Sequence, residues 1–447
     1  VDPALLQQAL DATFERYPLY HAVLRRGVFW YYLQDSDLRP VVTAEDLPTC
    51  APLYQADRRT LLFRVMHHRR RIVLEVFHAL SDGTGALWFL TDLLDAYHRL
   101  RFPHEGQARQ EGQQRQEGRN DPAAPGAGSS PAQGHTVAPT HELSPDSFRH
   151  YFIRRRDPMP DGPAPFAREA APAILSVPGE PPSPPRDEDG RRRRRRRART
   201  RVHRVPGTRT PDHRTRAVEL TMPAGQVLDL ARAEGVSLTM YLTALFVEAV
   251  RASSGGLGAA RTIAVSVPVN LRQFFPSTSA RNFFATVRVA HTYGEGDDGL
   301  GAVARRLDGR FRPQVAPAAL ERKLRRFIRF ERMPLLRILP RPLKDLVLRL
   351  VNSGNNRGLT LAVSNLGRVT FPEPAASHVG RVLFQVSAVR PQFCAISHAG
   401  VLTVTFTSPF VETGHIRDFT RMLTAQGVDV DLVAAPVTEA ELAQVQP

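Results

Sequence analysis

Apolar and polar residues alternate along the first hundred residues with the periods of helices and strands. Apolar positions three and four apart predict a helix over residues 4–17, and an aromatic-rich stretch predicts a strand over residues 29–33. A hairpin is predicted over residues 61–77, because Ile72, Leu74 and Val76 lie two residues apart and so share one face of a strand. Another helical stripe of apolar residues covers residues 87–97.

The second half of the chain has the same mixture of predicted elements. Strands are predicted over residues 217–221, 261–268, 285–291, 359–363, 380–386 and 401–406. Helices are predicted over residues 223–234, 237–252, the first part of 301–319, 320–352 with breaks at its prolines, and 415–425. Because strands and helices interleave in both halves, the predicted fold class is α/β (α+β), with mixed sheets in two lobes flanked by helices.

Residues 104–216 have a different composition from the rest of the chain. They are rich in Gln, Glu, Arg, Gly and Pro, and they contain seven consecutive arginines from Arg191 to Arg197. Such a segment buries too little apolar surface to offset the entropy of ordering it, so we predict a long disordered insertion with one ordered patch at residues 148–153. The predicted organisation is an N-terminal lobe (1–103), the insertion (104–216), a C-terminal lobe (217–435) and a tail (436–447).

The net charge of +16 suggests a nucleic-acid or anionic-membrane partner, but its distribution weakens that interpretation. Residues 104–216 hold 22 basic and 14 acidic residues, which is half of the excess. The arginine run is an anion-binding arm or a solvated tract. Because no aromatic residues interleave its arginines, it offers no base-stacking surface, and nucleic acid is not an expected partner.

Two cysteines, Cys50 and Cys394, exclude a disulfide scaffold and zinc sites built on cysteine pairs. They are consistent with a reducing compartment, so a cytoplasmic protein is expected. No apolar run approaches the ~20 residues that a membrane span needs. The leucines and arginines of residues 320–351 leave two interpretations open, contact with an anionic membrane surface and a helix pair with a solvated basic face.

The segment from Val76 to Gly83 carries the most informative chemistry. His78 stands where an apolar strand ends, and the Asp82-Gly83 pair stands where a helix begins. Histidine takes and returns protons near neutral pH, so His78 is a candidate general base. Asp82 is placed to cap the helix, and Gly83 is expected to allow a tight turn. Taken alone, the spacing also fits a purely structural histidine.

Four segments together resemble one superfamily. One of them, His78 to Gly83, resembles the HHxxxDG signature. In chain order, the other three are Gln7 to Phe14 with Arg16-Tyr17-Pro18, Ser266 to Arg272 with Arg281 to Phe284, and Ser364 to Gly367. These match, in order, motifs of the condensation-domain and chloramphenicol-acetyltransferase superfamily, and the likeness is closest to bacterial alcohol acetyltransferase-like proteins. It covers roughly residues 1–100 and 217–430. Phe77 departs from the pattern, since it replaces the first His of HHxxxDG. The resemblance implies a chloramphenicol-acetyltransferase-like fold with a tunnel between two lobes.

The resemblance also implies an O-acyltransferase. His78 would take the proton from an alcohol or lipid acceptor, which attacks the carbonyl of acyl-CoA and expels the thiol. Acyl-CoA would be a co-substrate, and neither a bound cofactor nor a metal is required. Two alternatives stay open: a carrier-protein-dependent condensation domain that forms an amide or ester, and a non-catalytic binding protein of the same fold. Acyl chain length, acceptor and oligomeric state are not determined by the sequence.

Supporting roles are assigned to several polar residues. Asp82 is expected to be structural, with Arg272 as its ion-pair partner, because a buried carboxylate needs one. Ser364 and Asn365 are the candidates for stabilising an oxyanion, although Ser-Asn-x-Gly is also a turn sequence. Asn270 either lines the site or caps a strand.

Other histidines and aromatic residues carry no predicted chemistry. His67 and His68 lie in the predicted hairpin, and no third ligand at metal spacing accompanies them, so no metal site is predicted. The cluster of Trp30, Tyr31 and Tyr32 is expected to be part of a core or a tunnel wall.

Overall fold

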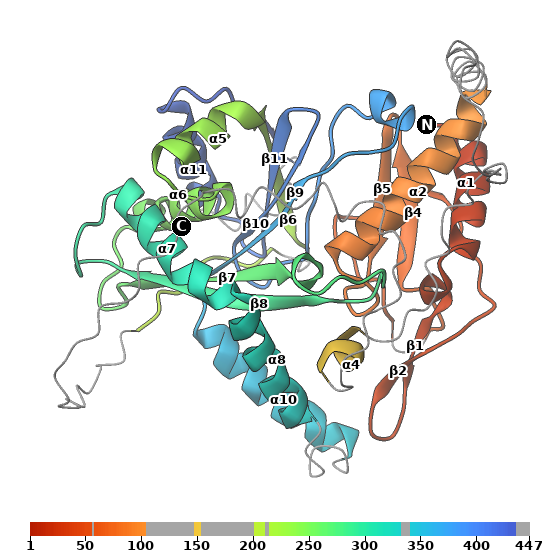
Figure 1. Ribbon diagram of the computed structural model, residues 1–447, viewed down its shortest axis with the longest axis horizontal. Coiled ribbons are helices and arrows are strands. Elements are labelled where there is room, and N and C mark those ends of the chain that lie inside the picture. Colours follow the sequence, from red (N-terminus) through yellow and green to blue (C-terminus); the bar gives the residue numbers. More distant parts are fainter. Residues whose placement is uncertain (56–57, 104–146, 153–200, 211–213, 332–339, 435–447) are drawn as a thin grey trace, which may run out of the picture.

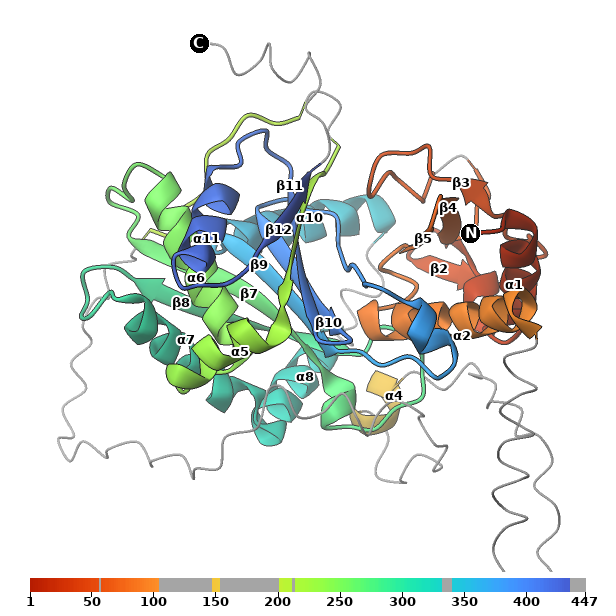
Figure 2. The same ribbon diagram turned by 90° about the horizontal axis from the view of Figure 1, so that it is seen from above.

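The computed structural model describes residues 1–55, 58–103, 147–152, 201–210, 214–331 and 340–434 (Figure 1). Two lobes lie side by side, and each has its own sheet and its own hydrophobic core (Figure 2). The predicted two-lobed α/β fold with mixed sheets is confirmed.

The N-terminal lobe packs two antiparallel helices on a small sheet. In chain order, its elements are α1 (Pro3–Glu15), η1 (Pro18–His21), β1 (Val23–Arg26), β2 (Tyr31–Gln34), β3 (Thr43–Ala44), β4 (Phe63–His68), β5 (Arg71–Val76) and α2 (Gly83–Arg101). The three-stranded sheet has the order β3–β4–β5, and β1 and β2 form a separate hairpin. The predicted early helix, the hairpin and the helix after the motif are all present.

Local chemistry explains where α1 begins and which face it buries. The Asp2 carboxylate accepts hydrogen bonds from the backbone N–H groups of Ala4 and Leu5, which satisfies two of the free donors at a helix start. Leu6, Leu10 and Phe14 follow at a spacing of four, and all three are buried against β4 and α2.

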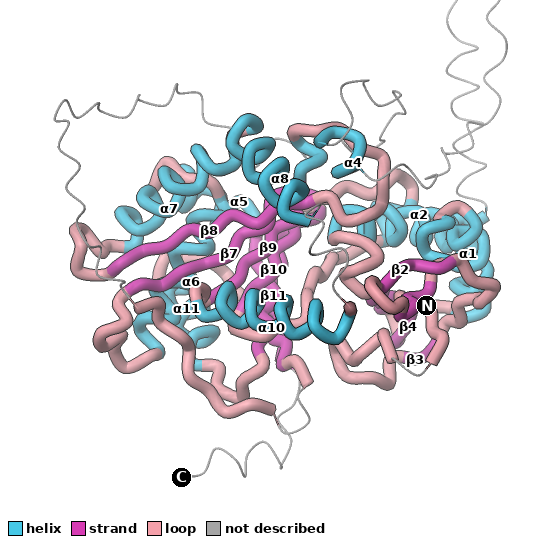
Figure 3. The backbone as a smooth tube through the Cα atoms, turned by 90° about the horizontal axis from the view of Figure 1, so that it is seen from below, coloured by secondary structure: helices cyan, strands magenta, loops and turns pink. Residues whose placement is uncertain are grey.

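The C-terminal lobe is built on a seven-stranded mixed sheet with the order β12–β6–β11–β10–β9–β7–β8 (Figure 3). Its strands are β6 (Arg216–Pro223), β7 (Thr262–Asn270), β8 (Phe284–Thr292), β9 (Leu361–Arg368), β10 (Gln392–His398), β11 (Val401–Ser408) and β12 (Asp431–Ala434). β9 runs parallel to both of its neighbours, β10 and β7, and the other pairs are antiparallel.

Helices cover one face of this sheet, and the N-terminal lobe lies beyond the other face (Figures 1 and 2). The covering helices are α5 (Ala224–Ala233), α6 (Leu238–Ser253), α7 (Leu300–Val315) and α11 (Gly414–Thr424). The remaining helices and helical turns are α4 (Ser147–Phe152), η2 (Leu271–Gln273), α8 (Pro317–Glu331), α10 (Arg341–Arg357) and η3 (Ala375–His378). No single described helix is long and apolar enough to cross a membrane, and α5 with α6 passes that test only as a pair bent by 86°.

The strand predicted over residues 380–386 is wrong. This segment runs beside β11 without pairing as a strand, and side chains bond its carbonyls instead. Thr403 Oγ1 donates to the carbonyl of Val382 at 2.6 Å, and Thr407 Oγ1 donates to that of Val386 at 2.9 Å. An extended, half-buried segment therefore produced the alternating pattern of a strand.

Two strands of the large sheet were not predicted. β10 lies in the centre of the sheet, and nearly all of its residues are buried. It therefore lacks the alternation of apolar and polar residues that marks a strand with one solvent-exposed face. β12 has only four residues and lies at the sheet edge, where its pairing with β6 comes from a distant part of the chain.

The predicted insertion over 104–216, its arginine run and the tail over 436–447 lie mostly outside the described residues. The ordered patch predicted at 148–153 is present as α4, whose Phe152 is buried against the C-terminal lobe. Disorder is wrong for residues 201–210, because Val202 forms a β-bridge with Thr262 and Arg209 forms one with Phe410. These bridges are backbone contacts to segments distant in the sequence, which composition does not reveal.

The aromatic cluster of Trp30, Tyr31 and Tyr32 is not part of a core. Its side chains are 44%, 41% and 52% exposed, and they lie at the tip of the β1–β2 hairpin and on β2. The core placement is wrong because an aromatic run of this kind is usually buried, whereas this hairpin projects from its lobe. A place in a tunnel wall stays a prediction.

Candidate active site

His78 lies at the junction of the two lobes. It follows β5 of the N-terminal lobe, and its carbonyl accepts a hydrogen bond from Asn282 Nδ2 of the C-terminal lobe at 2.6 Å. Its imidazole is exposed and lies 5.4 Å, between ring centroids, from the Phe284 ring at the start of β8. The candidate base is therefore accessible, while its backbone is bonded across the junction.

Asp82 ties this loop to both lobes. Its Oδ1 accepts from the N–H of Gly85 at 2.9 Å and so caps α2. Its Oδ2 accepts from Arg272 Nη1 at 2.7 Å and from the N–H of Phe283 at 2.8 Å. The carboxylate is buried, and three donors compensate its loss of hydration. Because the donors come from both lobes, Asp82 fixes the loop that starts at His78.

Arg272 is the ion-pair partner expected for Asp82, and the structure contains this pair. The guanidinium is buried, and its Nη2 also donates to the carbonyls of Ser279 and Arg281, at 2.7 and 2.6 Å. It stacks over the Trp88 ring of α2 at 5.1 Å. Arg272 thus joins α2 to the segment that leads into β8.

Two glycines of the motif serve close packing between the lobes. Gly83 does not have a positive φ, so it begins α2 and does not supply the tight turn that the sequence suggested. A Cβ at Gly83 would lie 3.0 Å from Leu366 Cδ2. A Cβ at Gly85 would lie 2.2 Å from the carbonyl oxygen of Ala280, so only glycine fits there. Sequence reasoning missed Gly85, although its place two residues after Gly83 was a usable signal.

Asn270 caps a helical turn and joins the lobes. Its Oδ1 accepts from the N–H of Arg272 at 3.0 Å, which starts η2, and its Nδ2 donates to Thr84 Oγ1 at 3.2 Å. Of the two roles considered for Asn270, the structure shows capping at the end of β7.

Asn365 lies within β9, where the register between β9 and β10 shifts. Its Nδ2 donates to Thr239 Oγ1 at 2.9 Å, and its Oδ1 accepts from the N–H of Gly367 at 2.7 Å. Gly367, two residues further along β9, has φ +78°, a conformation that glycine adopts readily. Because both ends of the Asn365 amide are bonded, Ser364 is the better placed of the two oxyanion candidates.

Ser364 faces the N-terminal lobe. Leu361 and Val363 of the same strand belong to the core under the helices, so the alternate residues Ala362 and Ser364 point to the opposite side of the sheet. Leu366 follows on that side and packs near Gly83 of α2. Ser364 is therefore on the face that borders the junction of the lobes.

Ser364 belongs to a polar row that crosses four strands. The strand registers align Ser364 with Cys394, Cys394 with Thr405, and Thr405 with Glu219. Oγ1 of Thr405 is buried and, within the part of the chain that the structure describes, has no hydrogen-bond partner. Nothing in the sequence pointed to this row, because these strands are far apart along the chain.

The row ends at an ionic contact between the lobes. The Glu219 carboxylate of β6 lies 3.9 Å from Arg71 of β5 and 3.9 Å from Arg381. Arg71 also pairs with Glu45 in its own lobe, at 2.6 Å. The two lobes are thus joined at Glu219 as well as at Asp82.

Neither cysteine is a candidate nucleophile. Burial, with the nearby Glu75 carboxylate, raises the pKa of the Cys50 thiol to about 12. Burial also raises the pKa of the Cys394 thiol. Both stay protonated near neutral pH, and the thiolate is the reactive form of cysteine. Among the described residues, no group of three or more His, Cys, Asp or Glu side chains is arranged to hold a metal ion.

Comparisons with known proteins identify the fold. No known protein family and no curated protein sequence matches the chain. Polyketide synthase associated protein 5 from Mycobacterium tuberculosis is similar in structure, with a TM-score of 0.51 and 15% identity over 95% of this chain and 89% of that one. The epimerization domain of the third module of tyrocidine synthetase B gives a TM-score of 0.51 and 12% identity, over 95% and 87%.

A longer protein contains the same fold as one part. The nonribosomal peptide synthetase FmoA3 gives a TM-score of 0.51 and 14% identity, over 95% of this chain and 39% of that one. The closer resemblance to bacterial alcohol acetyltransferase-like proteins stays a prediction. These likenesses establish that the chain has the condensation-domain-like fold that its motifs suggested.

Proposed function

We propose that this protein is an acyltransferase of the condensation type, which moves an acyl group from a thioester to a hydroxyl or an amine. The observation that carries the proposal is the buried Asp82 carboxylate, which binds groups of both lobes and fixes the loop of the exposed His78. A histidine held in this way at a junction of lobes is suited to accept a proton from a substrate bound there.

In the proposed reaction, His78 takes the proton from the acceptor while the acceptor's oxygen or nitrogen attacks the thioester carbonyl. The tetrahedral intermediate collapses, the carbon–sulfur bond breaks, and the proton passes from His78 to the leaving thiolate. The Ser364 hydroxyl is the proposed donor to the oxyanion. A general base of this kind contributes about 10²–10⁴ in rate. Asp82 and Arg272 position the loop and do not touch the reacting atoms.

A thioester tethered to a carrier protein is the favoured donor. The support is the nature of the similar structures, which include a part of tyrocidine synthetase B, a nonribosomal peptide synthetase and a polyketide synthase associated protein. Acyl-CoA is the second donor class. Both donors carry the same thioester chemistry, so the experiment must compare them directly.

The test measures acyl transfer by the purified full chain from two donors, an acylated carrier protein and the matching acyl-CoA, to a panel of alcohols and amines. Wild type is compared with His78→Ala, and His68→Ala serves as the matched control because His68 is an exposed histidine on β4. We expect acceptor-dependent transfer that only the His78 variant loses, with higher kcat/KM for the carrier-bound donor.

Other outcomes would decide against the proposal in distinct ways. If acyl-CoA supports transfer and the acylated carrier protein does not, the donor is acyl-CoA, and the proposed role of His78 as the base is unchanged. No transfer from either donor by a folded protein would favour a non-catalytic binding protein of the same fold.

A further inference from the structure

Most of the exposed large apolar side chains in the described part of the chain gather in three segments. They are Val28 to Tyr32 at the tip of the β1–β2 hairpin and on β2, Phe327 on α8, and Leu343, Leu346, Leu348, Leu350 and Val351 on α10. All three segments lie on one side of the molecule, below the large sheet in Figure 1, and Figure 3 looks onto α8 and α10 from that side. We call these three segments the apolar surface.

The hairpin and α10 are bonded to each other, so this part of the apolar surface is a single unit. The N–H of Arg341 donates to the carbonyl of Val28 at 3.1 Å, and Lys344 Nζ donates to that of Phe29 at 2.9 Å. Lys344 Nζ also lies 3.3 Å from the centroid of the Trp30 ring. Specific contacts thus hold the aromatic tip beside the start of α10.

α10 exposes an apolar stripe along its length. Leu343, Leu346 and Leu350 are spaced by three and four residues, so they lie on one face of the helix. Their exposed fractions are 48%, 53% and 66%, and Lys344 is the one buried residue of α10. Leaving such a stripe in water costs free energy in proportion to its area, so we infer that an apolar partner covers it.

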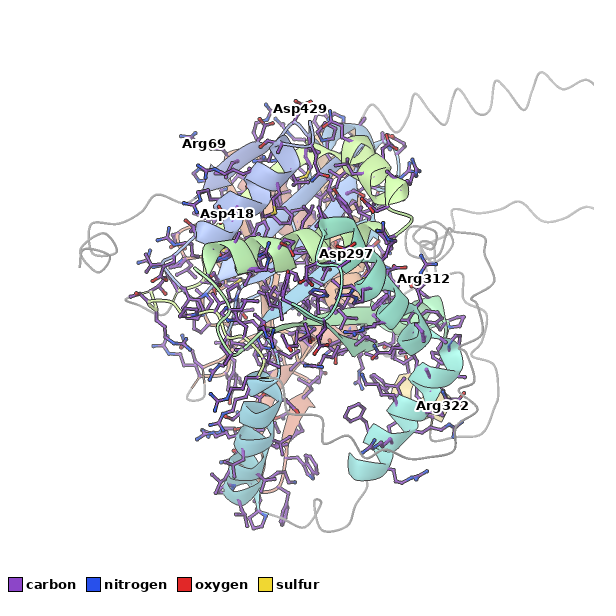
Figure 4. All side chains as sticks on the ribbon, turned by 90° about the vertical axis from the view of Figure 1, so that its left-hand side faces the viewer. Arg69, Asp297, Arg312, Arg322, Asp418 and Asp429 are labelled. Carbon is purple, nitrogen blue, oxygen red and sulfur yellow. The ribbon has the colours of Figure 1, made fainter. Side chains whose placement is uncertain are left out.

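Basic side chains flank the apolar surface. Arg322, Arg325, Arg326 and Arg329 are exposed on α8, and Arg349 is exposed on α10. In Figure 4, α8, which carries the labelled Arg322, and α10 both extend toward the lower end of the molecule, apart from each other. Exposed leucines, aromatic rings and arginines in this combination match the acyl region, the headgroup level and the negative charge of an anionic bilayer.

The groove beside α10 is also amphipathic. It has a volume of about 480 Å³ and opens to solvent between Tyr31 and α10. Leu348 and Val351 provide its apolar lining, and Asp345, Arg349, Asn352 and Asn355 provide charged and polar groups. Such a lining can contact both the chain and the headgroup of a lipid.

We propose that the apolar surface docks this protein on an anionic lipid bilayer. A protein partner would have to match two projecting helices and a hairpin tip with complementary hollows, whereas a fluid bilayer adapts to separate convex tips. The excess of arginines over acidic residues on α8 complements negative headgroups. This inference does not depend on the proposed acyl transfer.

The test is flotation of the full chain with vesicles of phosphatidylcholine alone and of phosphatidylcholine mixed with phosphatidylglycerol. We expect binding to the mixed vesicles, weakened by added salt. Leu346→Glu combined with Leu350→Glu should lower vesicle partitioning by about tenfold or more. Leu432→Glu combined with Val433→Glu is the matched control, since these exposed apolar residues lie on β12, away from the apolar surface, and it should bind as wild type does.

A second variant tests the charge contribution, and size-exclusion chromatography tests the alternative occupants. Arg322→Gln combined with Arg326→Gln should weaken binding to the mixed vesicles, and circular dichroism checks that each variant is folded. The proposal would be overturned if the wild-type chain does not bind the mixed vesicles at low salt. In that case, a dimer that Leu346→Glu dissociates would show that a second copy of the chain covers the surface, and a monomer would show that it does not. Unchanged binding by the folded Leu346 and Leu350 variant would overturn the proposal as well.

Discussion

The Asp82 carboxylate and the Arg272 guanidinium meet at 2.7 Å in the buried junction between the two lobes. The two residues are 190 positions apart in the chain, and they join the helix after the motif to the segment that leads into β8. The pair therefore links the stability of the junction to the geometry of the His78 loop. The contribution of the pair can therefore be measured both as protein stability and as enzyme activity.

Replacing Asp82 should destabilise the protein and lower its activity together. In Asp82→Asn, the buried Arg272 loses its counter-charge, and breaking a buried pair in this way costs about 3–5 kcal/mol. Urea unfolding measures the loss. The control is Asp229→Asn, whose pair with Arg232 at 3.0 Å is exposed and should matter by about 1 kcal/mol or less. An Asp82→Asn protein as stable as wild type would show that the pair does not support the junction.

Gly85→Ala should disturb the contact between the lobes. The added Cβ would lie 2.2 Å from the carbonyl oxygen of Ala280, so α2 or the segment before β8 must shift, at a cost of about 1–3 kcal/mol. Gly225→Ala is the matched control, because nothing lies within 4 Å of a Cβ at this position in α5. Thermal unfolding of both variants checks this, and equal melting temperatures would contradict the packing argument.

His415 should make the protein less stable in acid. Burial lowers the pKa of His415 from 6.5 to about 4 in the folded protein. The unfolded chain therefore binds the proton more readily, so this contribution to stability is complete above pH 6.5 and is lost as the pH falls toward 4. The loss amounts to about 3 kcal/mol.

The measurement is the unfolding free energy of wild type and His415→Leu across this pH range. The leucine variant should have a flatter profile, because leucine keeps an apolar side chain next to Phe246 and cannot be protonated. Burial also lowers the pKa values of His203 and His291, so some acid sensitivity should remain. Identical pH profiles for the two proteins would contradict the assignment to His415.

Ser364→Ala should slow the proposed reaction without unfolding the protein. Removing one oxyanion donor typically lowers kcat by about 10²–10³. Ser377→Ala in η3 is the control, because its hydroxyl donates to the carbonyl of Pro374 on the surface. A Ser364→Ala enzyme with the wild-type kcat would show that another group stabilises the oxyanion.

The sequence was most informative where local chemistry and packing agree. The place of His78 at a strand end, the cap at Asp82 and the partner Arg272 followed from residue types and from a family resemblance. The helices followed from their apolar spacing. These features depend on short segments, or on a buried charge that needs a specific partner.

The features that were missed depend on contacts between distant segments. The row from Ser364 to Glu219 exists only through the registers of four strands, and β10 shows no alternation because it is buried on both faces. Gly85 is required by the carbonyl of Ala280, which belongs to the other lobe. The exposure of Trp30 depends on a hairpin that projects beside α10. Apart from the place of Gly85 in the motif, none of these relationships is encoded in a local pattern.

The central claim is that His78 acts as the base in acyl transfer from a thioester. Its most direct test is the rate of acceptor-dependent transfer by wild type and by folded His78→Ala, with the same donor and acceptor. The account predicts that the variant's kcat falls by about 10²–10⁴. A His78→Ala protein that transfers acyl groups at the wild-type rate would contradict the account.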